Sequence, residues 1–443
     1  MSGELAQNCY LENNPPNAKT RASLLGTPGL LLFGAYGAGP IRGLHMFDDH
    51  LYVVSGRTLY RVRSNSTYEE LGTVEGTGTV QMINNGNDVA ITTGETGYFA
   101  NRTDFGVLDE VDLIGATYQD GYGIFAKRGT EQFYISALPE GDGFRSISAL
   151  AFSSADAFPD KLVGLVSDHR ELWLFGKESI EVWQNAGLAS FPFVRAGSGF
   201  MERGCGATHS IAKDQNRVFW LGDDLRVYTA SGYQPQPIST PAIDYQIGRQ
   251  NAPEAARGFI YQQEGHHHYV LTFQTATFAY DLTTGLWHSR KSHGIDRWRA
   301  DGNVFAWGKQ LVGDYSSGNI YELDQETYSE NGEILERVAI GGPIHNNGNR
   351  TIMDEFFLDL DMGMGLTAGQ GSDPQLILDW SDDGLRTWSN RLMRSAGEIG
   401  EYGKRARWHG LGAFRQRSLR VAMTDPVPFR LHSAYWRGRA LQQ

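Results

Sequence analysis

Pairs of short apolar runs, each pair separated by a polar or glycine-containing turn, recur through the first three quarters of the chain. Within each run, apolar and polar positions alternate with period two, which predicts β-strands, and the short turn predicts a hairpin. Successive pairs begin 33 to 51 residues apart, about 43 on average. The seven predicted hairpins begin at Leu51, Val89, Tyr122, Leu172, Val218, Tyr269 and Gln310.

Further strands are available for each repeat. A third strand precedes the hairpin at Gly43, Val80, Leu165 and Ile211, and linking segments such as the one at Tyr68 can supply a fourth. Repeats of ~40–50 residues with four short strands are typical of β-propeller blades. Seven repeats favour seven blades, with six or eight as alternatives. One β-sandwich or two in tandem is the alternative fold, because the repeats lack the WD and kelch signature residues.

The repeat stops near Ile340, and about five strands without that spacing follow. They begin at Glu355, Leu376, Thr387, Ser418 and Phe429. The glycine-rich stretch 362–373 predicts a loop among them. The whole chain is therefore predicted to be all-β. It divides into an extended N-terminal arm (1–40), a β-propeller (41–339) and a C-terminal β-sandwich-like domain with a basic surface (340–443).

The composition agrees with a turn-rich globular protein. The 443 residues include 54 glycines and 12% aromatics, and no apolar run is long enough to span a bilayer. The two cysteines, Cys9 and Cys205, are far apart, so they predict neither a metal-binding pair nor a disulfide framework but two small buried side chains. Residues 1–5 lack the basic and apolar features of a secretory signal, so we expect the chain to stay in the cytoplasm after synthesis.

Charge is distributed unevenly along the chain. From Arg386 to Gln443, twelve Lys and Arg and three acids give a net charge of +9. The whole chain has a net charge of −12, so the preceding 385 residues carry −21. Arginine among aromatics is favoured in protein interfaces, which makes this basic end the candidate functional surface. A solvated basic face is one alternative, and direct DNA binding is another, which the acidic remainder weakens. The interface candidates are Lys404, Arg405, Arg407, Arg415, Arg417, Arg420, Arg430, Arg437, Arg439, Trp408, Phe414, Tyr435 and Trp436.

The segment 381–388 (SDDGLRTW) resembles the Asp-box turn of sialidases, with its glycine one place early. Such a turn is a structural device, so Asp383, Gly384 and Trp388 are predicted to be structural.

No motif for catalysis, a metal or a cofactor emerges. His266 and His268 could share one face of a strand, but only Glu264 is a near acid, which favours a solvated strand edge over a metal site. The glycine-rich segment 34–43 lacks the Lys-Ser/Thr of a phosphate-binding loop and predicts a turn into the first blade. The carboxylate pairs at 48–49 and 223–224 are predicted in hairpin turns. We therefore predict no enzyme, no cofactor and no metal.

Three stretches, 8–30, 172–222 and 407–429, together resemble the packaged-DNA stabilisation proteins, also called tail accessory or nozzle proteins, of short-tailed bacteriophages. The resemblance implies a non-enzymatic virion tail subunit with a β-propeller, of which six copies form a ring below the portal and its adaptor ring. It also implies that the ring retains the packaged DNA and mounts the tail needle and the spikes or fibres.

The acidic body fits a ring around DNA, because carboxylates repel phosphates and would let duplex DNA slide without specific binding. Closure would then depend on loops or a partner, and the basic end would make the ring contacts. A carbohydrate-binding or glycan-cleaving propeller is the alternative, since aromatics and arginine are abundant and two carboxylates across a pocket could cleave a glycan. A cellular scaffold propeller is a third possibility.

Overall fold

The computed structural model describes residues 6–138, 142–156 and 159–441 and divides into two compact units. The propeller unit comprises residues 32–275 and 299–322. The sandwich unit comprises residues 1–31, 276–298 and 323–443. Residues 1–5 lie outside the described residues. The prediction that the chain stays in the cytoplasm after synthesis depends on these residues.

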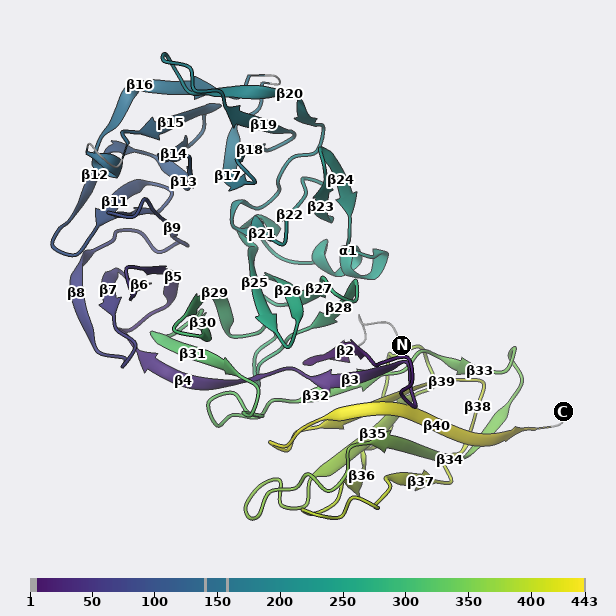
Figure 1. Ribbon diagram of the computed structural model, residues 1–443. Helices are drawn as coiled ribbons and strands as arrows, with labels where there is room; N and C mark the ends of the chain where they lie inside the picture. Colours follow the sequence, from purple (N-terminus) through teal and green to yellow (C-terminus); the bar gives the residue numbers. More distant parts are fainter. Residues whose placement is uncertain (1–5, 139–141, 157–158, 442–443) are drawn as a thin grey trace. The chain divides into compact units, whose positions relative to one another are not determined.

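Six four-stranded antiparallel sheets and one hairpin make up the propeller unit (Figure 1). The first sheet contains β5 (Ile41–Phe47), β6 (His50–Ser55), β7 (Thr58–Val62) and β8 (Tyr68–Thr73). The second contains β9 (Gln81–Asn84), β10 (Val89–Thr92), β11 (Thr96–Ala100) and β12 (Phe105–Val111). The third contains β13 (Leu113–Gln119), β14 (Tyr122–Lys127), β15 (Gln132–Ser136) and β16 (Ile147–Ser154). The next two are β17 (Leu162–Asp168), β18 (Glu171–Gly176), β19 (Ile180–Asn185) and β20 (Phe193–Met201); and β21 (Ala212–Asp214), β22 (Arg217–Leu221), β23 (Val227–Ser231) and β24 (Gln234–Pro237). The last two are the hairpin β25 (Arg257–Gln263) and β26 (His266–Thr272), and the sheet β29 (Ala300–Ala306), β30 (Lys309–Asp314), β31 (Asn319–Asp324) and β4 (Gly29–Ala35). The helical segments are η2 (Gly143–Arg145), η3 (Thr208–Ser210), α1 (Pro241–Ile247) and η4 (Pro253–Ala255).

The sheets surround one axis as propeller blades. First strands of neighbouring sheets contact one another, for example β5 with β9 and β13 with β17, and β29 contacts β5, so the last blade meets the first. The last four-stranded blade takes its outermost strand, β4, from the start of the chain. The prediction of a β-propeller with seven blades favoured is confirmed.

The middle strands of a blade are apolar on both faces because a neighbouring blade covers each face. In β6, Tyr52 and Val54 pack with Val89 of the second blade. Leu51 and Val53, which alternate with them, pack with side chains of the last blade such as Leu311. A single sheet could not bury both faces, so each blade depends on its two neighbours.

A recurrent turn joins the first two strands of the blades. Both central residues have positive φ, the conformation of a type I′ hairpin turn, whose twist matches that of the flanking strands. In the first blade, Asp48 (φ 52°) and Asp49 (φ 57°) occupy the turn, which confirms the prediction for this carboxylate pair. The corresponding turns of five other blades are 120–121, 169–170, 215–216, 264–265 and 307–308.

The turn into the first blade explains the glycine-rich segment 34–43. β4 ends at Ala35 and β5 begins at Ile41, so the predicted turn is confirmed. A Cβ on Gly39 would lie 2.0 Å from the carbonyl carbon of Ser317, and its φ is +77°. Only glycine fits this position without displacing the backbone.

Two sheets form the sandwich unit. Within this unit, the β39 sheet contains, in order, β27 (Thr277–Asp281), β28 (Leu286–Ser289), β1 (Ala6–Gln7), β32 (Arg337–Ile340), β39 (Gln416–Met423), β35 (Gln375–Ser381) and β36 (Leu392–Ser395), with β33 (Ile344–His345) also on β39. The β40 sheet contains β2 (Cys9–Asn13), β3 (Ala22–Gly26), β40 (Arg430–Ala440), β34 (Thr351–Leu360) and β37 (Arg407–His409), with β38 (Ala413–Phe414) also on β34.

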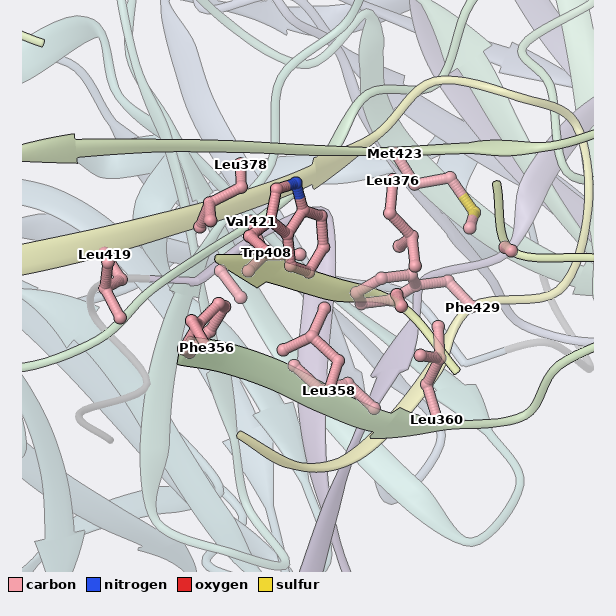
Figure 2. Close-up of a cluster of buried hydrophobic side chains, with 14 of the residues drawn as sticks. Phe356, Leu358, Leu360, Leu376, Leu378, Trp408, Leu419, Val421, Met423 and Phe429 are labelled. Carbon is pink, nitrogen blue, oxygen red and sulfur yellow. The ribbon is translucent and has the colours of Figure 1, made fainter. Parts of the chain in front are cut away.

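Alternate residues of β34 point into the core between the two sheets. Figure 2 shows Phe356 and Leu358 from β34 facing Leu376 and Val421 of the β39 sheet, with Trp408 between them. The predicted C-terminal β-sandwich is thus confirmed, and 362–373 is a loop as predicted.

The segment predicted as an extended arm consists of β1 to β4, and all four strands pair in sheets. β2 and β3 form a hairpin, and β3 pairs with β40 near the other end of the chain. The boundaries 1–40, 41–339 and 340–443 stay a prediction.

Candidate interface on the sandwich unit

The thirteen predicted interface residues fall into two groups by burial. Trp408 is fully buried and donates its indole N–H to the carbonyl of Leu392 at 3.2 Å. Phe414 is 4% exposed. Both side chains belong to the sandwich core, so they support the surface from beneath and do not offer contacts to a partner.

Arg417 is also internal. Its side chain is 2% exposed, and its guanidinium makes a bidentate pair with Asp382 at 2.7 and 2.8 Å. A third bond reaches the carbonyl of Leu411 at 2.6 Å, and the group lies over the rings of Trp380 and Phe414. Every face of this guanidinium is occupied within the chain, so its role is structural.

Arg420 is half-buried on the outer face of the β39 sheet. Its Nε donates to Asp379 at 2.7 Å, and its other donor pairs with the same carboxylate. The guanidinium lies 4.0 Å from the ring centre of Trp388. This pair fixes the turn at 381–388 against the strand beneath it.

The outer face of the β40 sheet carries aromatic and cationic side chains together. Tyr435 stacks on Phe357 of β34 with ring centres 5.2 Å apart. Arg407 and Arg437 lie over the same phenylalanine ring at 5.4 and 5.6 Å. Both arginines share the carboxylate of Glu355, at 3.0 and 3.5 Å. We call these five residues the cationic face.

A groove of about 420 Å³ adjoins the cationic face. Lys404, Arg405, Lys19 and Tyr402 line it together with Tyr435. Lys404 donates to Glu401 at 2.8 Å, and this bond raises the pKa of the lysine. Lys19 pairs with Asp359 of β34. The exposed guanidinium of Arg405 has no carboxylate partner among the described residues, so the groove presents an uncompensated positive charge.

The remaining candidates lie on or near the surface. Arg439 is 72% exposed, with Asp354 4.0 Å away, and Trp436 is 39% exposed and meets the ring edge of Phe414. Arg415 donates to the carbonyl of Gly348 at 2.6 Å, and Arg430 is exposed at the start of β40.

Three residues of this surface were absent from the sequence prediction. Lys19 and Phe357 lie far from the basic end in the chain and reach it only through strand pairing. Tyr402 is 71% exposed, yet nothing in its local sequence marks it. The alternation of β34 was the available signal, because it places Phe357 and Asp359 on the face opposite the core residues Phe356, Leu358 and Leu360.

The histidine prediction is wrong in part. His266 and His268 are 2% and 0% exposed, because β26 is covered on both faces, whereas a solvated edge was expected. Their rings stack 5.9 Å apart, and His268 also stacks on Tyr261. His267 pairs with Asp214. Among the described residues, no group of three or more His, Cys, Asp or Glu side chains could hold a metal ion.

Asp383 is a structural turn residue, as predicted. Its carboxylate accepts the backbone N–H groups of Arg386 and Thr387 at 2.9 and 3.0 Å and the hydroxyl groups of Ser381 and Thr387. These bonds hold the pKa of Asp383 well below its usual range. The carboxylate is thus occupied by its own turn.

The propeller unit carries a groove of about 950 Å³. Glu178, Asp223 and Glu254 line it, but its lining residues include no aromatic ring on which a sugar could stack.

Cys205, also in the lining, is buried, and burial raises the pKa of its thiol to about 12. Cys9 is equally buried, so both cysteines are buried as predicted.

Comparisons with known proteins agree on the architecture. Models of the bacteriophage P22 Gp10 family match in succession, the β-propeller over residues 8–328 and the β-sandwich over residues 336–439. No curated protein matches the chain. No helix among the described residues is long and apolar enough to cross a membrane.

Solved structures resemble the chain at low sequence identity. The WD40 domain of Neurospora crassa Pan2 is 9% identical, covers 67% of this chain and 95% of its own, and has a TM-score of 0.45. BamB from Moraxella catarrhalis is 8% identical, with 71% and 98% covered and a TM-score of 0.43. The two consecutive family matches extend over most of the chain, which therefore belongs to the bacteriophage P22 Gp10 family of structural phage tail proteins.

Proposed function

We propose that this chain is a subunit of the tail nozzle that completes the phage head after DNA packaging. Six copies form a ring below the portal or its adaptor ring, and the ring becomes part of the virion tail after synthesis in the host cytoplasm. The observation that carries the proposal is the succession of the two family matches along the chain. Neither role proposed for the ring, conduit or mount, requires a reacting group or a cofactor.

Electrostatics supports a role as a DNA conduit. Each chain carries a net charge of −12, and its first 385 residues carry −21, so a ring of such chains is negative overall. Phosphate binding by lysine and arginine releases counterions and makes basic surfaces adhesive to DNA, whereas an acidic wall repels the duplex. DNA is therefore retained by a physical closure and not by adhesion, and it can leave quickly once that closure opens.

The exposed cations and aromatics of the sandwich unit support a role in mounting other virion proteins. Tyr402 and Tyr435 are exposed large side chains that line the groove with Arg405, and Arg437 lies over the ring of Phe357 on which Tyr435 stacks. Tyrosine, tryptophan and arginine contribute most to binding energy in protein interfaces. This surface is proposed to contact a neighbouring copy, the adaptor or portal ring, or the tail needle, spikes or fibres.

Electron microscopy of the purified chain, alone and mixed with the adaptor ring protein, tests the proposal. The expected result is six-fold particles with a central hole that stack on the adaptor ring. Single chains that join neither one another nor the adaptor would contradict it.

Duplex DNA binding at low salt tests the conduit separately. We expect weak binding with little salt dependence, because few phosphates are neutralised. The variant pair Glu178→Lys and Glu254→Lys, on exposed positions of the propeller groove, is a matched control that should increase DNA binding. Tight, salt-sensitive binding of the unaltered chain would contradict a repelling wall.

A further inference from the structure

One edge of β40 is open. Its other edge pairs with β34 from Leu431 to Ala440. On the open side, β3 pairs with β40 only at Leu431 and Arg430. Among the described residues, no strand pairs with this side from Ser433 onward, and residues 434–440 are all exposed. Figure 1 shows β40 in yellow as the last strand of the chain. A regular strand with a free edge offers alternate N–H and C=O groups to an incoming strand.

The side chains beside this edge are suited to binding. Tyr435, Arg437 and Arg439 share one face of β40, because successive residues alternate, and their exposures are 41%, 71% and 72%. Neighbouring carboxylates pair with only some of the hydrogen-bond donors of Arg437 and Arg439. Glu355 lies 3.5 Å from Arg437 and is shared with Arg407, and the Asp354 carboxylate is 4.0 Å from Arg439. The two guanidinium groups therefore retain donors for further carboxylates.

The arginines also limit what can pair with the edge. If two copies of β40 paired with each other in registers centred on Arg437 or Gly438, arginine would lie opposite arginine, and like charges directly opposite are destabilising. An acidic strand would instead place carboxylates opposite Arg437 and Arg439. The same chain supplies acidic surface, since its first 385 residues carry −21.

We infer that the open edge of β40 receives, by strand addition, an extended acidic segment of a neighbouring copy of this chain. The contact joins two different surfaces, and a contact of that kind repeats around a rotation axis until the ring closes. The inference rests on the ring of the proposed function and identifies the edge that builds it.

Hydrogen exchange of the full chain, compared between single chains and assembled rings, tests this inference. Assembly should slow exchange of the amides within 433–440 at least tenfold, and should also protect one stretch within residues 1–385. The double variant Arg437→Glu and Arg439→Glu should abolish this protection and shift particles to single chains. The control pair Arg21→Glu and Arg386→Glu makes the same charge change at exposed positions elsewhere and should still assemble.

A second measurement identifies the facing segment. In the variant Arg437→Lys and Arg439→Lys the positive charges remain, so rings should form, and carbodiimide should join these lysines to a carboxylate of another copy. Mixing isotope-labelled and unlabelled chains distinguishes links between copies from links within one.

The outcomes separate the inference from the proposed function. Rings that form without added protection over 433–440 overturn the inference and leave the nozzle intact. Failure to form rings, alone or with the adaptor, overturns both. Protection of this edge that appears only with a different virion protein overturns the assignment to a neighbouring copy.

Discussion

The two units bury their sheets in different ways. In the propeller unit, middle strands such as β6 and β18 are buried on both faces, because a blade stands on either side. In the sandwich unit, β34 buries Phe356, Leu358 and Leu360 on one face, whereas Phe357 and Asp359 on the other face are only partly buried. The first arrangement makes a stiff wall whose middle strands have no free face, whereas the second keeps one free. The surface for partners is therefore expected on the sandwich unit.

The largest expected effect concerns the core that supports this free face. Trp408→Ala should lower the free energy of unfolding of the sandwich unit by about 3–5 kcal/mol, because it leaves a large cavity between the sheets. Denaturant unfolding followed by hydrogen exchange of each unit measures the effect. Trp436→Ala, at a 39% exposed position, is the matched control and should cost under ~1 kcal/mol. Both rings lie on the face of the β40 sheet that carries Phe356, so equal losses would mean that burial of the ring does not determine the cost.

The next effect tests whether the propeller wall relies on apolar packing alone. Arg42 is 2% exposed and donates to the carbonyls of Gly78, Gly56, Val74 and Glu75 at 2.6 to 2.9 Å. Arg42→Met should cost about 3 kcal/mol, because buried carbonyls lose their donors. Arg42→Lys should restore little, since a single ammonium cannot replace the planar guanidinium fork. If thermal unfolding shows that Arg42→Met lowers the free energy of unfolding by less than ~1 kcal/mol, apolar packing alone is sufficient to stabilise the propeller unit.

A smaller effect appears on acidification of the propeller unit. Burial lowers the pKa of His45 on β5 from 6.5 to about 4, and the side-chain amide of Asn84 lies 2.8 Å from its Nε2. Between these pH values His45 is protonated in the unfolded chain but neutral in the folded chain, so stability falls as pH drops from 6.5 to 4. His45→Gln should remove up to roughly 3 kcal/mol of this loss. Urea unfolding at pH 7 and pH 4.5 measures it, and an unchanged pH dependence would contradict burial of the ring.

The smallest effect lies in the turn on the sandwich unit. The pKa of Asp383 is depressed by its hydrogen bonds, so its contribution to stability is complete above the unfolded pKa of about 3.9 and declines as pH falls below it. Asp383→Asn should lower the Tm slightly at pH 7 and progressively less below pH ~4. Ser381→Ala, which removes one of the same bonds, should show the same trend, and a pH-independent difference would contradict it.

The sequence was sufficient for the repeated hairpins, because covering both faces of a blade leaves a local pattern of apolar runs. Leu51 to Val54 is such a run, and all four side chains are buried. The buried histidines of β26 were missed for the same reason. A polar residue in a strand covered on both faces looks, in sequence, like a residue at an edge.

The candidate interface could be predicted only as a segment. Arg417 and Arg437 are alike in sequence context, yet one is internal and the other 71% exposed, because strand register decides which face each side chain takes. The pairing of β3 with β40 joins residues about 400 positions apart. No local pattern predicts that contact, so Lys19 could not be assigned to the groove.

The strand β4 sets a constraint on synthesis. Residues 32–35 leave the ribosome early, but β31 follows only about 285 residues later, roughly 15–60 s at ordinary rates of translation. Throughout that interval the leucine-rich strand β4 has no β31 to pair with in the nascent polypeptide. The circle of blades can be completed only after most of the protein has been made, because a chain that ends before residue 319 lacks the strand that pairs with β4.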